Sequence, residues 1–197
     1  MSVSSNGLGG FNGSMSDGYN NGTGWSANFY NIELFDVRTG SGADTINLAS
    51  VQSDLHISTG AGDDYVLTGG GNNVIDFGTG DNFWSGDYSS ATTNISINFA
   101  TSTYSGPGSA TGTFVGAGYF YTGSGNDTIV SGTGLYSETF YAGAGDDSIT
   151  LAGGSDIANG EGGTDTLVLD YSASTRNQSM SVSSNGLGGF NGSMSDG

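Results

Sequence analysis

A nine-residue pattern that recurs along the chain constrains its fold more than any other feature. The pattern reads x-G-x-G-x-D-x-U-x, where U is an apolar residue, and its clearest copies begin at Thr39, Thr59, Thr122 and Ala142. The two glycines permit positive φ angles and close approach of the backbone, so the first half of each copy is a turn. The apolar residue that follows the aspartate by two places begins a short strand. The pattern therefore predicts alternating turns and strands.

The copies follow one another in a fixed register. Thr59, Thr68 and Phe77 begin three successive nonapeptides, so two nonapeptides would form one coil, such as the one that starts at Thr59 and ends before Phe77. Residues one coil apart would then stack on the same edge, about 4.8 Å from each other. The step from Asp44 to Asp64 is longer than two nonapeptides, which predicts a coil stretched by two positions.

This pattern resembles the calcium-binding nonapeptide repeat of RTX proteins, G-G-x-G-x-D-x-U-x. The resemblance covers roughly residues 39–86 and 122–169. It implies an all-β fold, a parallel β-roll or β-solenoid with short capping or spacer strands. Essentially no helix is expected, because no window of 11 residues has a helical period without several glycines.

Stacked aspartates require a counter-charge. Carboxylates one strand apart repel each other, and a divalent cation between adjacent turns would remove that repulsion and satisfy turn carbonyls that the coil leaves unpaired. Calcium suits such a place because it accepts several oxygens in flexible geometry, whereas magnesium demands a tight octahedron. Transition metals lack their preferred ligands, since His56 is the only histidine and there is no cysteine. The expected cofactor is therefore Ca²⁺, as several ions.

By the family motif, the metal ligands occupy the aspartate position of each copy and its equivalents. Asn73 and Asn82 stand at this position, where they keep an oxygen but lose the charge, so their sites are expected to be weaker or empty. Asp63 and Asp146 stand beside the motif aspartate and are expected to face solvent. The expected ligands, paired one coil apart, are Asp44 with Asp64, Asp64 with Asn82, Asp127 with Asp147, Asp147 with Asp165, Glu138 with Asp156, and, without a clear partner, Asn73.

Composition excludes several classes of partner. The formal charge is −17, and Arg38 and Arg176 are the only strong cations. Nucleic acids and anionic membrane surfaces are bound through Lys and Arg, so neither is expected. No apolar run approaches the roughly 20 residues of a membrane span. The chain opens without a signal-peptide pattern. Ten Tyr, ten Phe and two Trp argue against the disorder that a strongly acidic chain otherwise indicates.

Two longer repeats organise the chain. Residues 1–18 recur unchanged as residues 180–197, so that Met180 begins a second copy of the segment that Met1 begins. The simplest interpretation is a window of a longer tandem array, and an engineered duplication of the chain ends is the alternative. A weaker internal repeat relates Asp44 to Asp127 and Asp64 to Asp147. The predicted organisation is a spacer at 1–38 belonging to the preceding half-unit, a first half-unit at 39–121, and a second at 122–197 that includes the start of the next unit.

Core-facing positions can be predicted from the same patterns. Segments outside the motifs alternate between residues 25 and 37 and between residues 94 and 99. The expected inward side chains are Trp25, Ala27, Phe29, Ile32, Leu34, Val37, Val66, Ile75, Trp84, Ile95, Ile97, Phe99, Ile129, Phe140, Ile149, Ile157 and Leu167.

A structural function is expected. Repetition of one unit in tandem does not favour a catalytic function, but it provides length, stiffness and many equal contact surfaces. We expect a non-enzymatic calcium-binding repeat of a long bacterial surface or fibre-forming protein: a fibre, sheath, surface layer or adhesin stalk. The resemblance implies type I secretion, an extracellular or cell-surface location, and folding on external calcium. The expected partners are other copies of the repeat, in tandem or end to end, and a cell-surface polysaccharide is a further candidate.

Two alternative functions stay open. One is a non-catalytic, calcium-dependent C-terminal-type domain of an RTX enzyme or toxin. The sequence contains neither H-E-x-x-H nor G-x-S-x-G, and His56 aligns with Thr139 in the second half, so it is not a duplicated feature. The other is an ice-binding adhesin repeat, which would need regular ranks of residues, whereas Ser41, Ala61 and Thr79 occupy equivalent positions.

Overall fold

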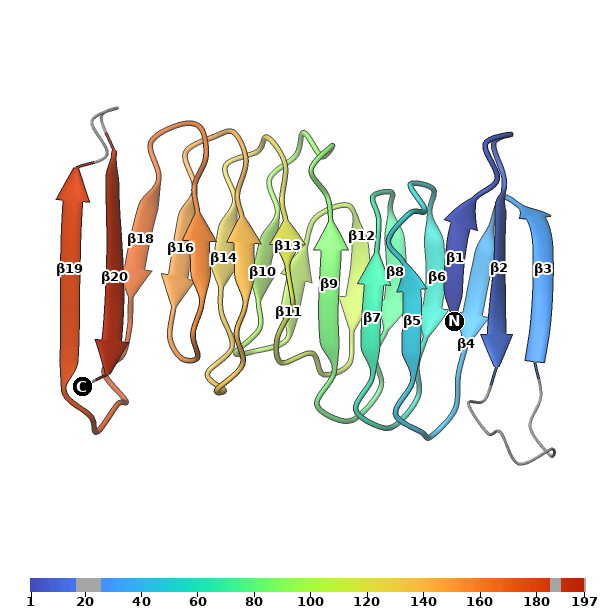
Figure 1. Cartoon of the computed structure of the whole chain (residues 1–197), viewed down its shortest axis with the longest axis horizontal. Coiled ribbons are helices and arrows are strands. Elements are labelled where there is room, and N and C mark those ends of the chain that lie inside the picture. The colour runs from blue at the N-terminus through green and yellow to red at the C-terminus, as the bar shows by residue number, and fades with distance from the viewer. Residues whose placement is uncertain (17–25, 185–188, 197) are drawn as a thin grey trace.

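The computed structural model describes residues 1–16, 26–184 and 189–196. Within these ranges every regular element is a β-strand. The chain winds into an elongated, flattened coil whose strands lie in two layers (Figure 1). The strands are short because a glycine-rich turn follows most of them. The predicted all-β solenoid is confirmed.

In chain order the strands are β1 (Ser2–Ser5), β2 (Phe11–Ser16), β3 (Ser26–Ile32), β4 (Phe35–Arg38), β5 (Thr45–Leu48), β6 (Leu55–Ser58), β7 (Tyr65–Thr68), β8 (Asn73–Asp76), β9 (Phe83–Asp87), β10 (Ser96–Asn98), β11 (Thr103–Ser105), β12 (Gly108–Thr111), β13 (Phe120–Tyr121), β14 (Thr128–Val130), β15 (Thr139–Tyr141), β16 (Ser148–Leu151), β17 (Ile157–Asn159), β18 (Thr166–Leu169), β19 (Gln178–Ser184) and β20 (Phe190–Asp196).

One sheet runs along the solenoid, and two shorter sheets cover its other side. The long sheet has the order β17-β15-β13-β9-β7-β5-β1-β2-β3. The shorter sheets are β12-β8-β6-β4 and β11-β10-β14-β16-β18. Strands of successive coils are parallel and in register, so that Ile46 lies beside Val66 and Ile129 beside Ile149. Side chains alternate along a strand, and these four all point inward and are buried.

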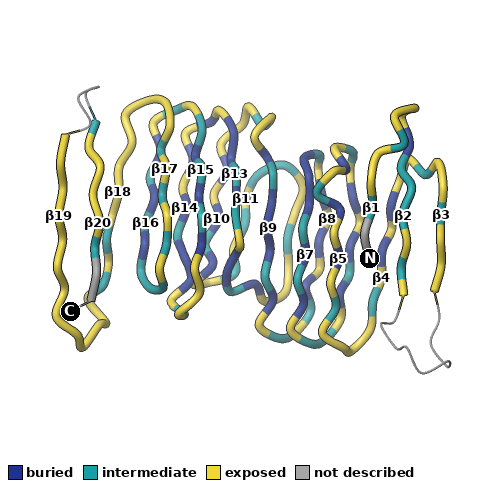
Figure 2. Tube along the Cα trace, viewed as in Figure 1, coloured by how far each residue is buried: buried dark blue, intermediate teal, exposed yellow. Residues whose placement is uncertain are grey.

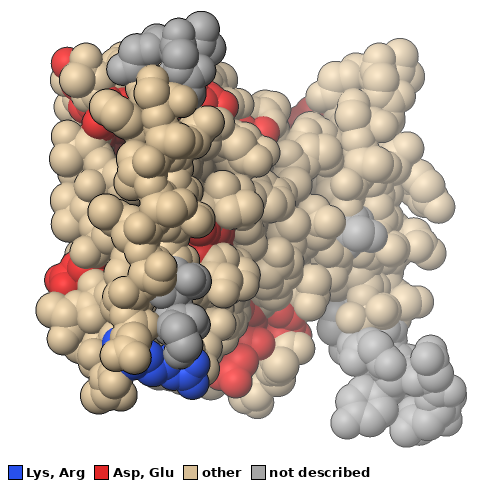
Figure 3. Space-filling view, turned by 60° about the vertical axis from the view of Figure 1, so that its left-hand side comes forward, with Lys and Arg blue, Asp and Glu red and all other residues tan. Residues whose placement is uncertain are grey.

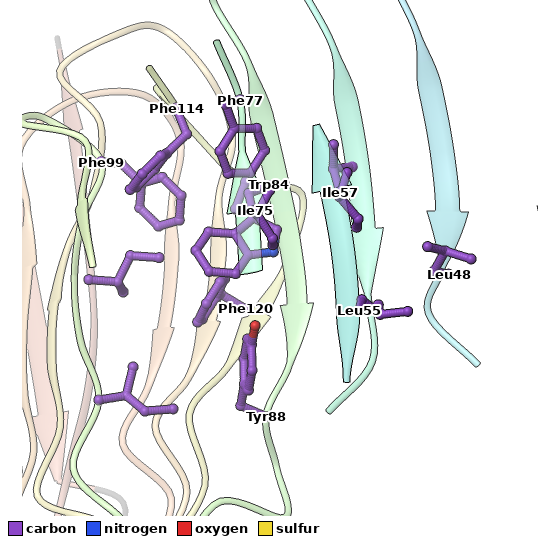
Figure 4. Close-up of a cluster of buried hydrophobic side chains, with 14 of the residues drawn as sticks. Leu48, Leu55, Ile57, Ile75, Phe77, Trp84, Tyr88, Phe99, Phe114 and Phe120 are labelled. Carbon is purple, nitrogen blue, oxygen red and sulfur yellow. The ribbon is translucent and has the colours of Figure 1, made fainter. Parts of the chain in front are cut away.

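An aromatic cluster fills the interior in the middle of the solenoid. The long segment 88–119 carries β10, β11 and β12 and brings Tyr104 and Phe114 against Trp84. The ring centroid of Trp84 lies 4.9 Å from that of Tyr104 and 5.2 Å from that of Phe120, and both contacts are edge-on. Figure 4 shows Trp84 among Phe77, Phe114 and Phe120. The indole Nε1 donates a hydrogen bond to Thr68 Oγ1 at 3.0 Å. Trp84, the largest side chain of the core, thus packs against other rings and has a hydrogen-bond partner for its N–H group.

The two homologous halves face opposite sides of the solenoid. Strands β5 and β7 lie in the long sheet, whereas their counterparts in the internal repeat, β14 and β16, lie in the five-stranded sheet. The second half is therefore displaced from the first by a whole number of coils plus half a coil, a half-integral offset. Strands on the two faces run in opposite directions (Figure 1). The turns that precede them, with their motif aspartates, consequently lie on opposite edges. Figure 3 shows acidic residues near both the upper and lower ends of one face.

The segment that occurs at both ends of the chain forms the same hairpin twice. Val3 pairs with Gly13 in the first copy, and Val182 pairs with Gly192 in the second. The first hairpin continues the long sheet, because β1 pairs with β5 and β2 with β3. The second hairpin is a two-stranded sheet of its own, and β19 is exposed along its length (Figure 2).

Most predicted inward positions are buried, but four of them are exposed. Leu34 is 74% exposed, because the alternation restarts at the buried Phe35, whose partner is Leu55. Ile157 is 59% exposed, because the register pairs Ala158 with the inward-facing Phe140. Leu167 pairs with the buried Ile149 but is 53% exposed, because β18 is the outermost strand of its sheet. Of the other positions, Trp25 lies outside the described residues, Ala27 is exposed, and Phe29 and Ile32 are half-buried.

Candidate metal sites

The motif aspartates form columns in which each carboxylate caps the coil before it. The backbone N–H of Asp44 donates to Asp64 Oδ1 at 2.8 Å. On the opposite edge, the N–H of Asp127 donates to Asp147 Oδ1 at 2.7 Å, and that of Asp147 donates to Asp165 Oδ1 at 3.1 Å. One oxygen of each capping carboxylate is therefore engaged in the hydrogen bond that joins successive coils. The pairs joined in this way are the same-edge pairs expected from the spacing of these residues in the sequence.

The second carboxylate oxygen has no hydrogen-bond partner at five of the predicted positions. These buried, unpartnered atoms are Oδ2 of Asp44, Asp64, Asp127, Asp147 and Asp156. A buried polar atom without a partner costs about 1–3 kcal/mol, and more if it is charged. The same atom lacks a partner in five equivalent turns, and a cation ligated by oxygen would satisfy it in each of them.

The surroundings of these oxygens fit calcium better than a transition metal. No three His, Cys, Asp or Glu side chains converge on one point in the described part of the chain. An ion here would take one or two carboxylates and complete its shell with backbone carbonyls and water. Calcium accepts such all-oxygen shells, whereas zinc and copper depend on imidazole or thiolate ligands.

Burial and crowding raise the pKa of Asp147. The largest cause is burial, which disfavours the charged form, and the charges of Asp127, Asp165 and Asp146 act in the same direction. The hydrogen bond from the Asp127 backbone opposes them. Without a cation, the middle of this column is thus a poor place for a carboxylate, and a cation would reverse that balance.

Glu138 differs from the aspartates because both of its carboxylate oxygens are engaged. Oε1 accepts the N–H of Ala117 at 3.0 Å, and Oε2 accepts the N–H of Gly132 at 2.9 Å. Burial raises the pKa of Glu138 to about 7. Its backbone N–H donates to Asp156 Oδ1 at 3.0 Å, so the two residues are neighbours as expected. Glu138 fastens two loop segments, and Asp156 alone of this pair has an unpartnered oxygen.

Asp63 and Asp146 are exposed, as expected, but each also makes a hydrogen bond to the neighbouring coil. Asp63 Oδ1 accepts the N–H of Asp81 at 2.9 Å, and Asp146 Oδ1 accepts the N–H of Thr164 at 2.9 Å. They form a second set of caps beside the motif aspartates. Sequence reasoning missed this role, because the position holds many residue types in this chain.

A threonine at the start of the motif links coils in the same way. The buried hydroxyl of Thr59 donates to Phe77 O at 2.9 Å, and that of Thr122 donates to Ala142 O at 2.9 Å. Thr39 makes the same bond to Thr59 O at 2.9 Å. The recurrence of threonine at this place is the sequence signal that could have revealed the contact.

Comparison with known families identifies the repeats. A family model, the RTX calcium-binding nonapeptide repeat, matches residues 56–83, 116–135 and 133–167, with four copies. This part of the chain belongs to the RTX repeat family. The RTX repeats bind calcium, the ion that the unpartnered oxygens fit. The matched ranges hold Asp64, Asp127, Asp147, Asp156 and Asp165, whereas Asp44 lies outside them but in the same column as Asp64. No curated protein and no solved structure matches the chain.

The position of Asp147 within its column predicts unequal effects of two substitutions. Asp147 lies between Asp127 and Asp165 and would contribute to the sites on both sides, whereas Asp165 is the last residue of the column. We expect Asp147→Ala to lower the number of calcium ions bound at saturation more than Asp165→Ala does. Isothermal titration calorimetry measures this number. Equal losses would show that the stacking does not define the sites.

The raised pKa values predict how the calcium-free chain responds to pH. The folded chain retains protons that the unfolded chain releases, and for Glu138 the window runs from the ordinary 4.5 to about 7. Stability without calcium is therefore lost as pH rises through this window and regained as pH falls. In calcium-free buffer, the β-sheet circular dichroism signal should grow from pH 7 towards pH 5. Glu138→Gln should weaken this dependence, and a signal that falls on acidification would contradict it.

Proposed function

We propose that this chain is a structural unit of a long, secreted bacterial surface or fibre-forming protein, and that it folds when it meets external calcium. The observation that carries the proposal is the set of five buried carboxylate oxygens without a partner, arranged in columns on both edges of the solenoid. Such an interior is unfavourable in the absence of a cation. The free energy of calcium binding then becomes free energy of folding.

A secreted location is consistent with this chemistry. RTX repeat proteins are typically secreted, and extracellular calcium is abundant enough to fill weak sites of the kind found in extracellular modules, with Kd of about 10⁻⁴–10⁻³ M. A chain that stays unfolded until it reaches that calcium remains extended for export. No helix long and apolar enough to cross a membrane occurs in residues 1–16, 26–184 and 189–196.

The surroundings of His56 support a structural function over a catalytic one. His56 lies on the outer surface of the four-stranded sheet in a shallow hollow with Asp36, Arg38 and Asp76. Arg38 pairs with Asp36 at 3.0 Å. In the part of the chain that the structure describes, no hydrogen bond joins His56 to a serine hydroxyl or a carboxylate. A nucleophile and base held together, as acyl transfer requires, are not found at this histidine.

The outer surface of the long sheet does not favour ice binding. Its outward rank across β5, β7 and β9 runs Thr45, Tyr65 and Phe83, and the next rank includes Asn47 and Leu67. A regular array that matches a crystal lattice needs the same small residue in each rank. These ranks instead mix aromatic, aliphatic and polar side chains.

The repeated hairpin supports an assembly of units end to end. In the first copy, β1 lies against β5: Asn47 N–H donates to Met1 O at 2.9 Å, and Ser50 Oγ donates to Val3 O at 3.1 Å. The second copy presents the same backbone and side chains, with Met180 62% and Val182 56% exposed. Its partner would be the edge equivalent to β5 in the next unit. In a tandem array the second copy opens the next unit, so this hairpin would join successive units into a filament.

Removal of calcium tests the proposed function. Without calcium we expect largely disordered columns and a weak β-sheet signal, and at millimolar calcium the full β-sheet spectrum should form. Circular dichroism with chelator and with restored calcium measures this change. Magnesium at the same concentration is the control and should restore little structure. A full β-sheet spectrum that persists in excess chelator would contradict the proposal.

Electron microscopy tests the assembly. The calcium-loaded native protein should form fibres or sheets whose axial repeat corresponds to one unit, the stretch of chain from Met1 to Ser179. Chelator should disperse them, because the unit ends no longer fold. Dispersed compact particles in calcium, together with a gene that encodes only one unit, would exclude an end-to-end array.

A further inference from the structure

Asn82 stands at a motif aspartate position, yet its turn is fully bonded. Its Oδ1 accepts the N–H of Asp64 at 2.8 Å, just as Asp64 Oδ1 accepts the N–H of Asp44. Its Nδ2 therefore occupies the atom position that at Asp64 is the unpartnered Oδ2. This Nδ2 donates to Thr113 O at 2.8 Å and to Phe77 O at 3.1 Å. Asn82 is completely buried, and its amide hydrogens hold carbonyl oxygens of the turn together.

Asn73 is satisfied in a similar way on the opposite edge. Its Oδ1 accepts the N–H of Leu55 at 3.2 Å. Its Nδ2 donates to Gly69 O at 3.1 Å and to the hydroxyl of Tyr88 at 3.0 Å. Both Asn73 and Tyr88 are 1% exposed. Neither asparagine leaves a buried side-chain oxygen without a partner, in contrast to the five aspartates.

We infer that Asn73 and Asn82 close their turns with amide hydrogens in place of calcium, so that these two turns hold no ion and need none. A calcium shell consists of oxygens, and an N–H group directed at the turn carbonyls competes with a cation for them. A neutral amide also removes the charge that the column would otherwise have to balance. The inference rests on the proposed calcium dependence of the aspartate turns.

Both amides attach the nonapeptide coils to the same neighbouring segment. Asn73 reaches Tyr88 and Asn82 reaches Thr113, and both partners belong to residues 88–119, which supply much of the aromatic cluster around Trp84. Hydrogen bonds and buried aromatic surface thus coincide in the middle of the chain. This part, from about β8 to β13, is therefore a block whose structure does not depend on calcium.

The second half of the unit lacks this arrangement. In the internal repeat, Asn73 corresponds to Asp156 and Asn82 to Asp165. These carboxylates lie in the last nonapeptides, before the segment that leads to β19. Where the first half meets the second, the turns are therefore closed by the amides of Asn73 and Asn82. Where the second half leads towards the next unit, the equivalent turns carry carboxylates and would be closed by calcium.

Hydrogen exchange measured by mass spectrometry in calcium-free buffer tests the inference. Peptides from residues 73–121 should exchange at least about tenfold more slowly than peptides from residues 122–169, and calcium should remove the difference. Rapid exchange throughout the calcium-free chain would overturn the inference while leaving the proposed function intact. Slow exchange throughout would instead overturn the proposed calcium dependence.

Asn82→Asp provides the decisive variant, with Asn72→Asp as its matched control. Asn72 carries the same amide but is exposed beside the motif position. Asn82→Asp should raise the number of bound calcium ions by one and speed calcium-free exchange in the middle block, whereas Asn72→Asp should do neither. Unchanged stoichiometry and exchange in Asn82→Asp would overturn the inference. If Asn82→Asp does not fold, Asp64→Asn supplies the converse test. It should bind fewer ions while keeping its slow exchange in calcium, and an unchanged ion count would overturn the inference.

Discussion

The hydrogen bond from the backbone of one motif residue to the side chain of the next, one coil further on, is the contact on which the solenoid depends. It sets each coil in register with its neighbour, and it consumes one of the two side-chain oxygens of each capping aspartate. Asp147 shows the result most clearly: Oδ1 caps Asp127, Oδ2 is buried without a partner, and burial together with the surrounding charges raises its pKa. The same contact that stacks the coils therefore leaves buried carboxylate oxygens that a cation would satisfy.

This stacking is so close that Gly145, a motif glycine of an inner coil, has no substitute. Gly145 has a φ of +136°, and a Cβ atom built on it would collide with the carbonyl oxygen of Gly125 in the coil before. A residue with a side chain would strain the backbone and separate the coils, and the carboxylate cap would then lose its donor. Glycine, capping carboxylate and calcium thus belong to one arrangement. Glycine permits the close spacing of the coils, this spacing brings the carboxylate to its backbone donor, and calcium would satisfy the carboxylate oxygen that remains.

The repeating part of this structure could be predicted from sequence because its spacing is rigid. Once Asp127 and Asp147 are assigned to the same edge, the parallel register and the buried Ile129 and Ile149 follow. Prediction failed where the period is interrupted. Ile157 follows its aspartate by one place instead of two, and the register buries Ala158 in its place. The antiparallel pairing of β10 with β11 has no periodic signal. The bonding of Asn73 could not be predicted either, since its amide partner is Tyr88, and only the packed interior brings the two together.

The half-integral offset between the two halves has a mechanical consequence. An ion that draws two coils together shortens the edge on which it lies, and the stack of coils tilts towards that edge. In the first half this edge carries Asp44 and Asp64, whereas in the second half the column from Asp127 to Asp165 lies on the other edge. The two tilts would have opposite sign, so they would oppose each other within a single unit. A duplication spanning a whole number of coils would have placed these two columns on the same edge, where their tilts would add and bend the rod into an arc.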